Sequence, residues 1–300
     1  MFVITGATGN TGKIVAQQLL ANKQSVRVVG RSADRLQPLV KQGAEAFVAE
    51  ITDAAALTRA FSGAQAVYAV IPSDLATPDV HAFQSRVTEA LAAAIERSGV
   101  KHVVALSSIG ADKPDKTGPV SGLYALEQRL SRIPGLNVLF LRAGYFMENT
   151  LAQASVIKQM GMAAGPLRPD VKLPMIATRD IGDAAAEALL RLEFTGSTTR
   201  ELLGQRDLSY AEAAGIIGNA IGKPGLNYVQ APDDQLRPVL VQMGMSPDVA
   251  NQILELSAAV NSAHLRALEP RTARNTTPTP FEAFVEEEFV PVYQGRSAAA

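Results

Sequence analysis

Three glycines near the start of the chain have the spacing of a loop that binds phosphate groups. They lie between a short apolar run at 2–5 and a helical pattern that begins at Lys13. In such a loop one glycine allows a sharp turn, one lets the backbone approach a diphosphate, and one lets the helix pack against the strand. The first N–H groups of the helix then bind the phosphates. The predicted dinucleotide site comprises Gly6, Thr8, Gly9, Asn10, Thr11 and Gly12.

The residues after the next apolar run bear on which dinucleotide is bound. A predicted strand at 25–29 is followed closely by Arg31 and Ser32. A site specific for NAD places Asp or Glu here to bind the ribose 2′-hydroxyl, but the first acid is Asp34. Arg31 instead offers a planar group that matches a 2′-phosphate, and Ser32 adds a hydroxyl. We therefore expect NADP(H) rather than NAD(H); the alternative is that Arg31 is a solvated loop cation.

Apolar residues that follow the third and fourth predicted strands complete the expected cofactor site. Ile51, with Thr52, follows the third strand and would flank the adenine. Ile71 and Pro72 follow the fourth strand and would approach the nicotinamide. Both positions lie at the carboxyl ends of strands, where ligands of open parallel sheets bind.

Short apolar runs alternate with helical patterns along the first half of the chain. Strands are predicted at 2–5, 25–29, 46–49, 66–71, 100–106 and 136–141. Helices are predicted at 13–21, 34–42, 54–61, 81–98 and 122–132, and the fourth ends at Gly99, where a C-cap glycine belongs. This alternation is typical of parallel βαβ units, so the predicted fold class is α/β with a Rossmann-type doubly wound parallel sheet. The same context favours nucleotide binding over an ordinary tight turn at the glycine loop.

The pattern is less regular after residue 150. Helices are predicted at 151–160, 180–192, 210–221, 233–243 and 247–263, and strands at 172–177, 201–204 and 227–230. Asp180 is expected to be an N-cap, and Thr279 before Pro280 should open a last helix. We predict a dinucleotide-binding Rossmann domain at 1–150 and a smaller, mostly helical substrate lobe at 151–295. Segments at about 172–204 of that lobe should return to the Rossmann sheet.

Composition and charge exclude several classes of protein. Apolar residues make up 47% of the chain, which excludes disorder. The net charge is -1 and no basic stripe is present, so nucleic acid is not an expected partner. No apolar run approaches the roughly 18 residues that span a bilayer, and no signal-like segment precedes the first strand, so we expect a cytoplasmic protein without a membrane partner. The chain has no Cys and three isolated His, so no metal site is expected.

Five segments spread along nearly the whole chain match one known family. They read TGATGNTG at 5–12, GRS at 30–32, VKHVVALSSIGA at 100–111, LRAGYFMEN at 141–149 and MIATRDIGDAAAEALL at 175–190. The combination resembles the NmrA-like family of atypical short-chain dehydrogenases/reductases. The functions that this resemblance implies are those of NAD(P)H-dependent quinone and triphenylmethane-dye reductases, of isoflavone-reductase-like enzymes, and of non-catalytic NAD(P)-sensing regulators. Because one fold serves all of these, the resemblance leaves the function open.

The resemblance also implies site residues after the fifth and sixth predicted strands. Ser107 and Ser108 should lie near the nicotinamide, and Ser108 matches the position of the catalytic serine of short-chain dehydrogenases. Tyr145, Phe146 and Asn149 should line the floor of the substrate cleft.

The catalytic pair of the short-chain dehydrogenases is incomplete in this chain. Those enzymes use Tyr-x-x-x-Lys on one face of a helix, where the Lys lowers the pKa of the Tyr so that the Tyr can donate a proton. Here Tyr124 is present, but Gln128 stands at the Lys position. Tyr124 and Ser108 are catalytic candidates on this pattern. The simpler alternative is that Tyr124 is a half-buried helix residue.

Two functions are compatible with these observations. The first is an NADPH-dependent reductase, a monomer or homodimer, that transfers hydride to a small aromatic, quinone-like or conjugated acceptor. Such an acceptor is electron-poor, so it needs positioning over the nicotinamide more than it needs the lysine. The second is a non-catalytic NADP(H)-sensing regulator that acts through a protein partner. Four methionines either form an adaptable apolar pocket wall or fill the core, namely Met160, Met162, Met243 and Met245.

Overall fold

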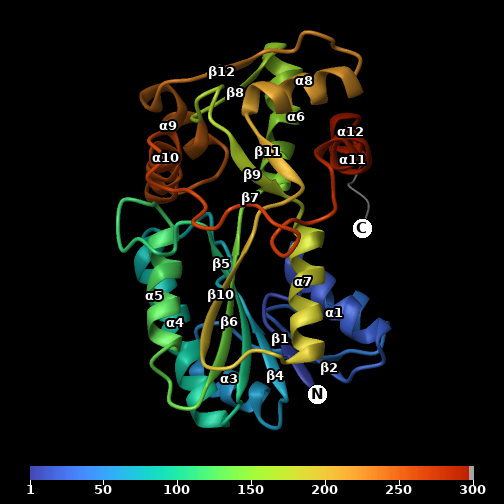
Figure 1. Ribbon diagram of the computed structural model, residues 1–300, viewed down its shortest axis with the longest axis vertical. Helices are drawn as coiled ribbons and strands as arrows, with labels where there is room; N and C mark the ends of the chain where they lie inside the picture. Colours follow the sequence, from blue (N-terminus) through green and yellow to red (C-terminus); the bar gives the residue numbers. More distant parts are fainter. Residues whose placement is uncertain (297–300) are drawn as a thin grey trace.

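A seven-stranded parallel sheet occupies the lower half of the molecule in Figure 1. The computed structural model describes residues 1–296. The strands are β1 (Phe2–Ile4), β2 (Val26–Gly30), β3 (Glu45–Val48), β4 (Ala66–Ala69), β5 (His102–Ser108), β6 (Asn137–Ala143) and β10 (Ser197–Leu202). Their order is β10-β6-β5-β4-β1-β2-β3, and every pairing is parallel. The predicted α/β class and doubly wound sheet are confirmed.

The chain changes direction within this sheet between β1 and β4. From β1 it first adds β2 and β3 on one side, and then it crosses to β4 on the other side. In open α/β sheets, ligands bind in the crevice that such a reversal leaves at the carboxyl ends of the strands. The loops after β1 and β4 therefore border the expected binding crevice.

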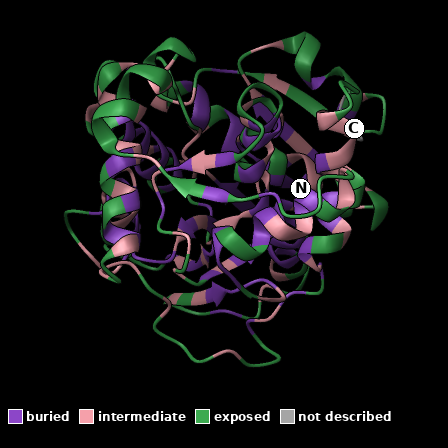
Figure 2. Ribbon diagram, turned by 90° about the horizontal axis from the view of Figure 1, so that it is seen from above, coloured by how far each residue is buried: buried purple, intermediate pink, exposed green. Residues whose placement is uncertain are grey.

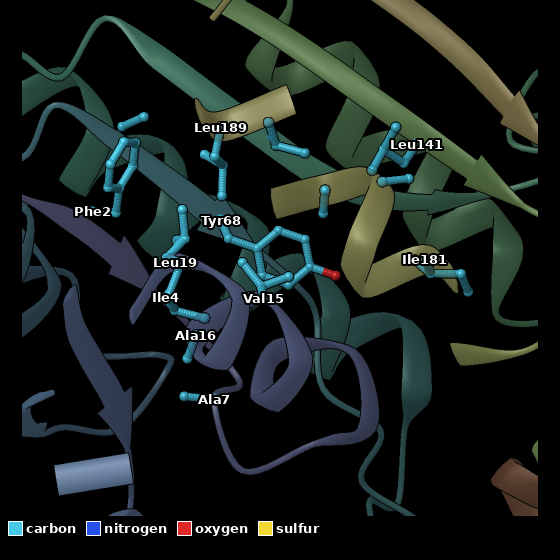
Figure 3. Close-up of a cluster of buried hydrophobic side chains, with 14 of the residues drawn as sticks. Phe2, Ile4, Ala7, Val15, Ala16, Leu19, Tyr68, Leu141, Ile181 and Leu189 are labelled. Carbon is cyan, nitrogen blue, oxygen red and sulfur yellow. The ribbon is translucent and has the colours of Figure 1, made fainter. Parts of the chain in front are cut away.

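Helices cover both faces of the sheet. One face carries α1 (Asn10–Ala21), α2 (Ala33–Val40) and α7 (Thr178–Arg191), and the other carries α3 (Ala54–Phe61), α4 (Val80–Ser98) and α5 (Val120–Leu130). Successive strand residues point to opposite faces, so Ile4 shares a buried cluster with Val15 of α1, whereas Val3 shares the other with Leu57 of α3. Figure 3 shows the first cluster around Tyr68. Burial on both faces explains why these strands read as continuous apolar runs.

Helices α1 and α7 pack closely because Gly182 has no side chain. A Cβ at Gly182 would lie 2.5 Å from the Cβ of Ile14 in α1. Both helices precede parallel strands of the sheet, so both begin at its carboxyl edge. The start of α7, at Thr178, therefore lies at the height of the glycine loop.

The other elements form the upper half of Figure 1 around a third buried cluster that includes Phe281, Phe284 and Phe289. Strands β7 (Tyr145–Phe146), β9 (Leu173–Ile176) and β11 (Arg206–Leu208) form one small sheet, and β8 (Ala163–Gly165) pairs with β12 (Tyr228–Gln230). The helical elements are η1 (Met147–Ala152), α6 (Gln153–Met160), α8 (Tyr210–Ala220), α9 (Asp233–Gln242), α10 (Pro247–Asn261), α11 (Phe281–Phe284), η2 (Val285–Phe289) and α12 (Val290–Tyr293). Figure 2 shows buried residues at the centre and exposed residues on the outer sides of the peripheral helices. In the described part of the chain, no helix has the length and apolar character needed to cross a membrane.

The later sequence contributes to both halves of the molecule. Strand β10 belongs to the large sheet, where it pairs with β6, and helix α7 packs on one face of that sheet. The strand predicted at 172–177 is present as β9, but it pairs with β7 and β11 in the small sheet. A domain boundary at about residue 150 stays a prediction.

Two predicted helix caps are wrong. Asp180 lies inside α7, whose N-cap is Ala177, and its carboxylate accepts hydrogen bonds from the backbone N (3.0 Å) and Oγ1 (2.6 Å) of Thr279. Thr279 is thereby held in the core, and the helix that follows takes Pro280 as its N-cap. The two side chains satisfy each other across the fold, which a local sequence pattern cannot indicate.

Candidate functional site

The glycine loop joins β1 to α1, and it is folded tightly against the residue that follows β4. Gly6 has a φ of 60°, a left-handed conformation that favours glycine, and a Cβ there would overlap the side chain of Val70. A Cβ at Gly12 would lie 2.8 Å from the carbonyl carbon of Gly6. Gly9 is the N-cap of α1, and its N–H donates to the Gly6 carbonyl at 2.9 Å. The absence of side chains at Gly6 and Gly12 thus shapes a backbone cradle.

The first turn of α1 leaves N–H groups available within this cradle. No side chain among residues 1–296 caps the helix, and its first turn contains no acidic residue. The N–H groups of Asn10, Thr11 and Gly12 have no intrahelical acceptor, because they precede the first bond of the helix. Such a helix end attracts anions through its N–H groups and its dipole. The cradle lies on the β1 side of the β1/β4 crevice, so its geometry fits the diphosphate of a dinucleotide.

The polar side chains of the loop differ in their availability. The Thr11 hydroxyl accepts a hydrogen bond from the Tyr68 hydroxyl at 2.9 Å in the core. Burial raises the pKa of Tyr68, so this phenol stays protonated. Thr8 is half-buried and Asn10 is exposed, and within the described chain neither side chain forms a hydrogen bond. Thr8 and Asn10 are thus freer than Thr11 to contact a ligand.

Arg31 lies at the outer end of the expected crevice, directly after β2. It is exposed and makes no hydrogen bond or ion pair with residues 1–296. Ser32 is the N-cap of α2, and its hydroxyl accepts from the backbone N of Arg35 at 3.4 Å. The guanidinium of Arg31 is therefore available for a 2′-phosphate, and this role stays a prediction.

The apolar candidates follow the neighbouring strands. Ile51 and Ile71 are half-buried and pack against the cluster beneath α3 and α4, and Pro72 is also half-buried. They follow β3 and β4 at the carboxyl edge of the sheet. Their partial exposure is compatible with contact to the adenine and the nicotinamide, and these roles stay predictions.

A buried ionic network, which sequence reasoning missed, lies at the carboxyl ends of β5 and β6. Ser107 donates to Glu127 Oε1 at 2.6 Å, and Arg142 donates to the two carboxylate oxygens at 3.0 and 2.6 Å. Ser107 and Arg142 are paired in register on adjacent strands, and Glu127 comes from α5. The hydrogen bonds that Arg142 donates to Glu127 raise the pKa of Arg142. The Ser107 hydroxyl is thus already engaged, and its predicted place near the nicotinamide stays a prediction.

Ser108 and Tyr124 make no hydrogen bond with each other in residues 1–296. Ser108 donates to the carbonyl of Ile109 at 2.9 Å, and the half-buried Tyr124 makes no side-chain hydrogen bond with residues 1–296. Gly122, two residues earlier, faces Gln84 of α4. Residues two apart lie on nearly opposite sides of a helix, so Tyr124 points away from α4. Catalytic roles for Ser108 and Tyr124 stay predictions, and the exposed Gln128 adds no charge.

Tyr145 belongs to a cluster of three tyrosines above the sheet. Its hydroxyl lies 3.0 Å from that of Tyr210, and the ring of Tyr210 lies 4.8 Å from the ring of Tyr228. Burial raises the pKa of Tyr145 and, more strongly, that of Tyr210. Both phenols therefore stay protonated and are weak acids. Phe146 packs on the cluster of the sheet, whereas the exposed Asn149 lies close enough to the Tyr145 hydroxyl to oppose the rise of its pKa, so two of the three predicted cleft residues lie together.

A second feature missed from the sequence is the carboxylate of Glu148. Its Oε1 accepts from the backbone N (2.8 Å) and Oγ1 (2.6 Å) of Thr178, so Glu148 caps α7 from another element. Its Oε2 is buried and has no partner in the described residues. Burial raises the pKa of Glu148. Its position within LRAGYFMEN was the only available signal, and it did not reveal this contact.

Comparison with known proteins gives consistent matches along the chain. The model of the NmrA-like family matches residues 1–285. The chain is 28% identical over 286 residues to an NAD(P)H azoreductase of Xenophilus azovorans, covering 95% of this chain and 96% of that protein. It is 29% identical over 286 residues to a (4-alkanoyl-5-oxo-2,5-dihydrofuran-3-yl)methyl phosphate reductase of Streptomyces griseus, covering 95% of each chain. The crystal structure of an NADPH-dependent quinone oxidoreductase of Escherichia coli, complexed with NADPH, has a TM-score of 0.75 at 23% identity and covers 95% of this chain and 98% of that chain.

Proposed function

Since the chain belongs to the NmrA-like family, we propose that it is an NADPH-dependent oxidoreductase that transfers hydride to a small aromatic, quinone-like or conjugated acceptor. The observation that carries this proposal is the glycine cradle at the start of α1. Its N–H groups are uncapped by any side chain of residues 1–296, and two of its glycines leave room that a side chain would fill. This combination suits a dinucleotide diphosphate.

The residues of the chain would act on the cofactor in three places. The N–H groups of Asn10, Thr11 and Gly12 bind the diphosphate. Arg31 binds the 2′-phosphate through charge-assisted hydrogen bonds, which selects NADPH over NADH. The loop after β4, with Ile71 and Pro72, supports the nicotinamide end. The bound dihydronicotinamide supplies the hydride.

The acceptor class follows from what the chain offers for proton transfer. Gln128 stands where a lysine would activate Tyr124, and the buried tyrosines around Tyr145 are weak acids. A quinone or an azo compound is electron-poor, so two electrons pass to it as hydride while water supplies the proton. The names of the relatives, an azoreductase and a quinone oxidoreductase, support the same class.

A second function is favoured by the absence of a hydrogen bond between Ser108 and Tyr124 in the described chain. A protein that binds NADP(H) without catalysis could report the redox state to a protein partner. Binding of both NADP+ and NADPH, with no turnover of any acceptor, would support this alternative.

The proposal is tested with the purified full-length protein. Calorimetric titration with NADPH and NADH should show tighter binding of NADPH. The loss of NADPH absorbance should then be followed with menadione, an azo dye and a triphenylmethane dye as acceptors. Gly12→Val, checked for folding by circular dichroism, should abolish NADPH binding, because its side chain would fill the cradle. Full-strength binding by Gly12→Val would contradict the cradle, and no turnover of any acceptor would contradict the reductase.

A further inference from the structure

Helix α9 carries an apolar stripe that the fold covers only in part. None of the residues of α9 is buried in the described structure. Pro238 lies inside the helix and removes one backbone hydrogen bond, so α9 is held weakly. Apolar residues recur with the spacing of one helix face, at Leu236, Val239, Leu240 and Met243, and these four are called the α9 stripe. Val239 is 48% exposed and Met243 is 53% exposed, whereas Leu236 and Leu240 are half-buried.

The end of α9 is fastened to the loop that borders the β1/β4 crevice. The backbone N of Ser246 donates to the Leu75 carbonyl at 2.8 Å, and its Oγ donates to the Thr77 carbonyl at 2.6 Å. Asp248, at the start of α10, accepts from the backbone N of Val80 at 2.8 Å. Leu75 itself is 51% exposed. The α9 stripe thus ends three residues before a junction with the nicotinamide side of the expected site.

The chemistry and size of the stripe indicate its occupant. Neither the stripe nor Leu75 carries a charge or a hydrogen-bonding side chain, so a charged ligand would gain nothing from it. With Leu75 the surface comprises five residues, whereas a stable protein interface uses roughly 20–30 residues on each side. A small apolar ring system fits this surface better than a second copy of the chain does.

We propose that the α9 stripe and Leu75 form the wall that binds the acceptor, and that they select flat, uncharged ring systems such as naphthoquinones. This inference rests on the proposed function, because the wall lies beside the nicotinamide only if the β1/β4 crevice holds NADPH. Helix α9, none of whose residues is buried, packs onto the acceptor when the acceptor binds. Met243 supplies an adaptable surface for rings of different shape.

The test compares two sets of exposed positions on the same helix. The stripe variant is Val239→Gln with Met243→Gln, and the matched control is Val241→Gln, which is 38% exposed and lies about 200° around the helix from Val239. None of these side chains is buried, so each variant should fold. Menadione binding is measured by calorimetry in the presence of NADP+, where no hydride can transfer, and NADPH binding is measured separately.

The stripe variant should bind menadione about tenfold more weakly, the loss expected when roughly 50 Å² of apolar contact is removed. Its NADPH affinity should match wild type, and Val241→Gln should change neither affinity by more than about twofold. A sulfonated naphthoquinone should bind wild type more weakly than menadione does. Equal menadione affinities in the stripe variant and the control would overturn the inference, as would a stripe variant that only changes the oligomeric state.

Failure of the inference is distinguishable from failure of the proposed function. If wild type binds NADPH but no naphthoquinone, the acceptor wall is refuted while the cofactor site stands. If wild type binds no NADPH, the proposed function itself is refuted, and with it the premise of the acceptor wall.

Discussion

Removal of the Glu127 carboxylate should destabilise the fold strongly, because it leaves a buried cation without its partner. The side chains of Glu127 and Arg142 are only 5% and 12% exposed. In Glu127→Ala the guanidinium stays buried, and the Ser107 hydroxyl loses its acceptor. Breaking a buried pair on one side costs about 3–5 kcal/mol, and a lost neutral hydrogen bond adds about 1 kcal/mol. We expect a decrease of about 5 kcal/mol in the free energy of unfolding.

The measurement is urea unfolding at equilibrium, with an exposed carboxylate as the matched control. Glu89 is 62% exposed and binds Arg129 at 3.1 Å, so Glu89→Ala should lose less than about 1 kcal/mol. With a slope of about 3 kcal/mol per M, Glu127→Ala should shift the midpoint by roughly 1 M or more. The double variant Glu127→Leu with Arg142→Met removes both charges and should recover much of the loss. A single variant within about 1 kcal/mol of wild type, at an unchanged slope, would refute the reasoning.

Three further predictions concern the cofactor site, a buried carboxyl and helix packing. Arg31→Ala should weaken NADPH binding roughly 10- to 100-fold in calorimetry, since charge-assisted hydrogen bonds contribute about 1.5–3 kcal/mol. Arg31→Ala should leave NADH binding unchanged, and the exposed control Arg86→Ala should leave the binding of both coenzymes unchanged. Equal losses for both coenzymes in Arg31→Ala would contradict this role. Burial raises the pKa of Glu148, so the folded chain keeps this proton at a pH where the unfolded chain has lost it, and stability falls as pH rises through that interval. The unfolding free energy of wild type relative to Glu148→Gln should therefore decrease as the pH rises above about 4, where a glutamate of the unfolded chain loses its proton, and a constant difference would exclude this effect. Gly182→Ala should destabilise the fold by about 1–3 kcal/mol, because the added methyl group overpacks the contact with α1. Gly215 lies in a helix with open space around it, so Gly215→Ala should stabilise the fold by up to about 1 kcal/mol. Shifts of the melting temperature with the same sign in both variants would argue against this account.

The sequence alone determined the parallel sheet and the form of its phosphate-binding loop. These features depend on local requirements that the residue types express directly. Gly6 and Gly99 adopt φ values of 60° and 72°, which glycine allows without strain. Continuous apolar runs predicted the strands, because these strands are buried on both faces. The family resemblance rested on the same segments.

Only the tertiary structure decided which polar groups meet. Glu148 and Thr178 are 30 residues apart, and Asp180 and Thr279 are 99 residues apart. Such partners are chosen by strand register and helix packing, which long-range contacts set. The partly exposed α9 stripe shows the same limit, because its apolar spacing predicts burial as well as it predicts a binding surface. Whether another element covers a helix face is a property of the whole fold, since it depends on segments far away in the chain.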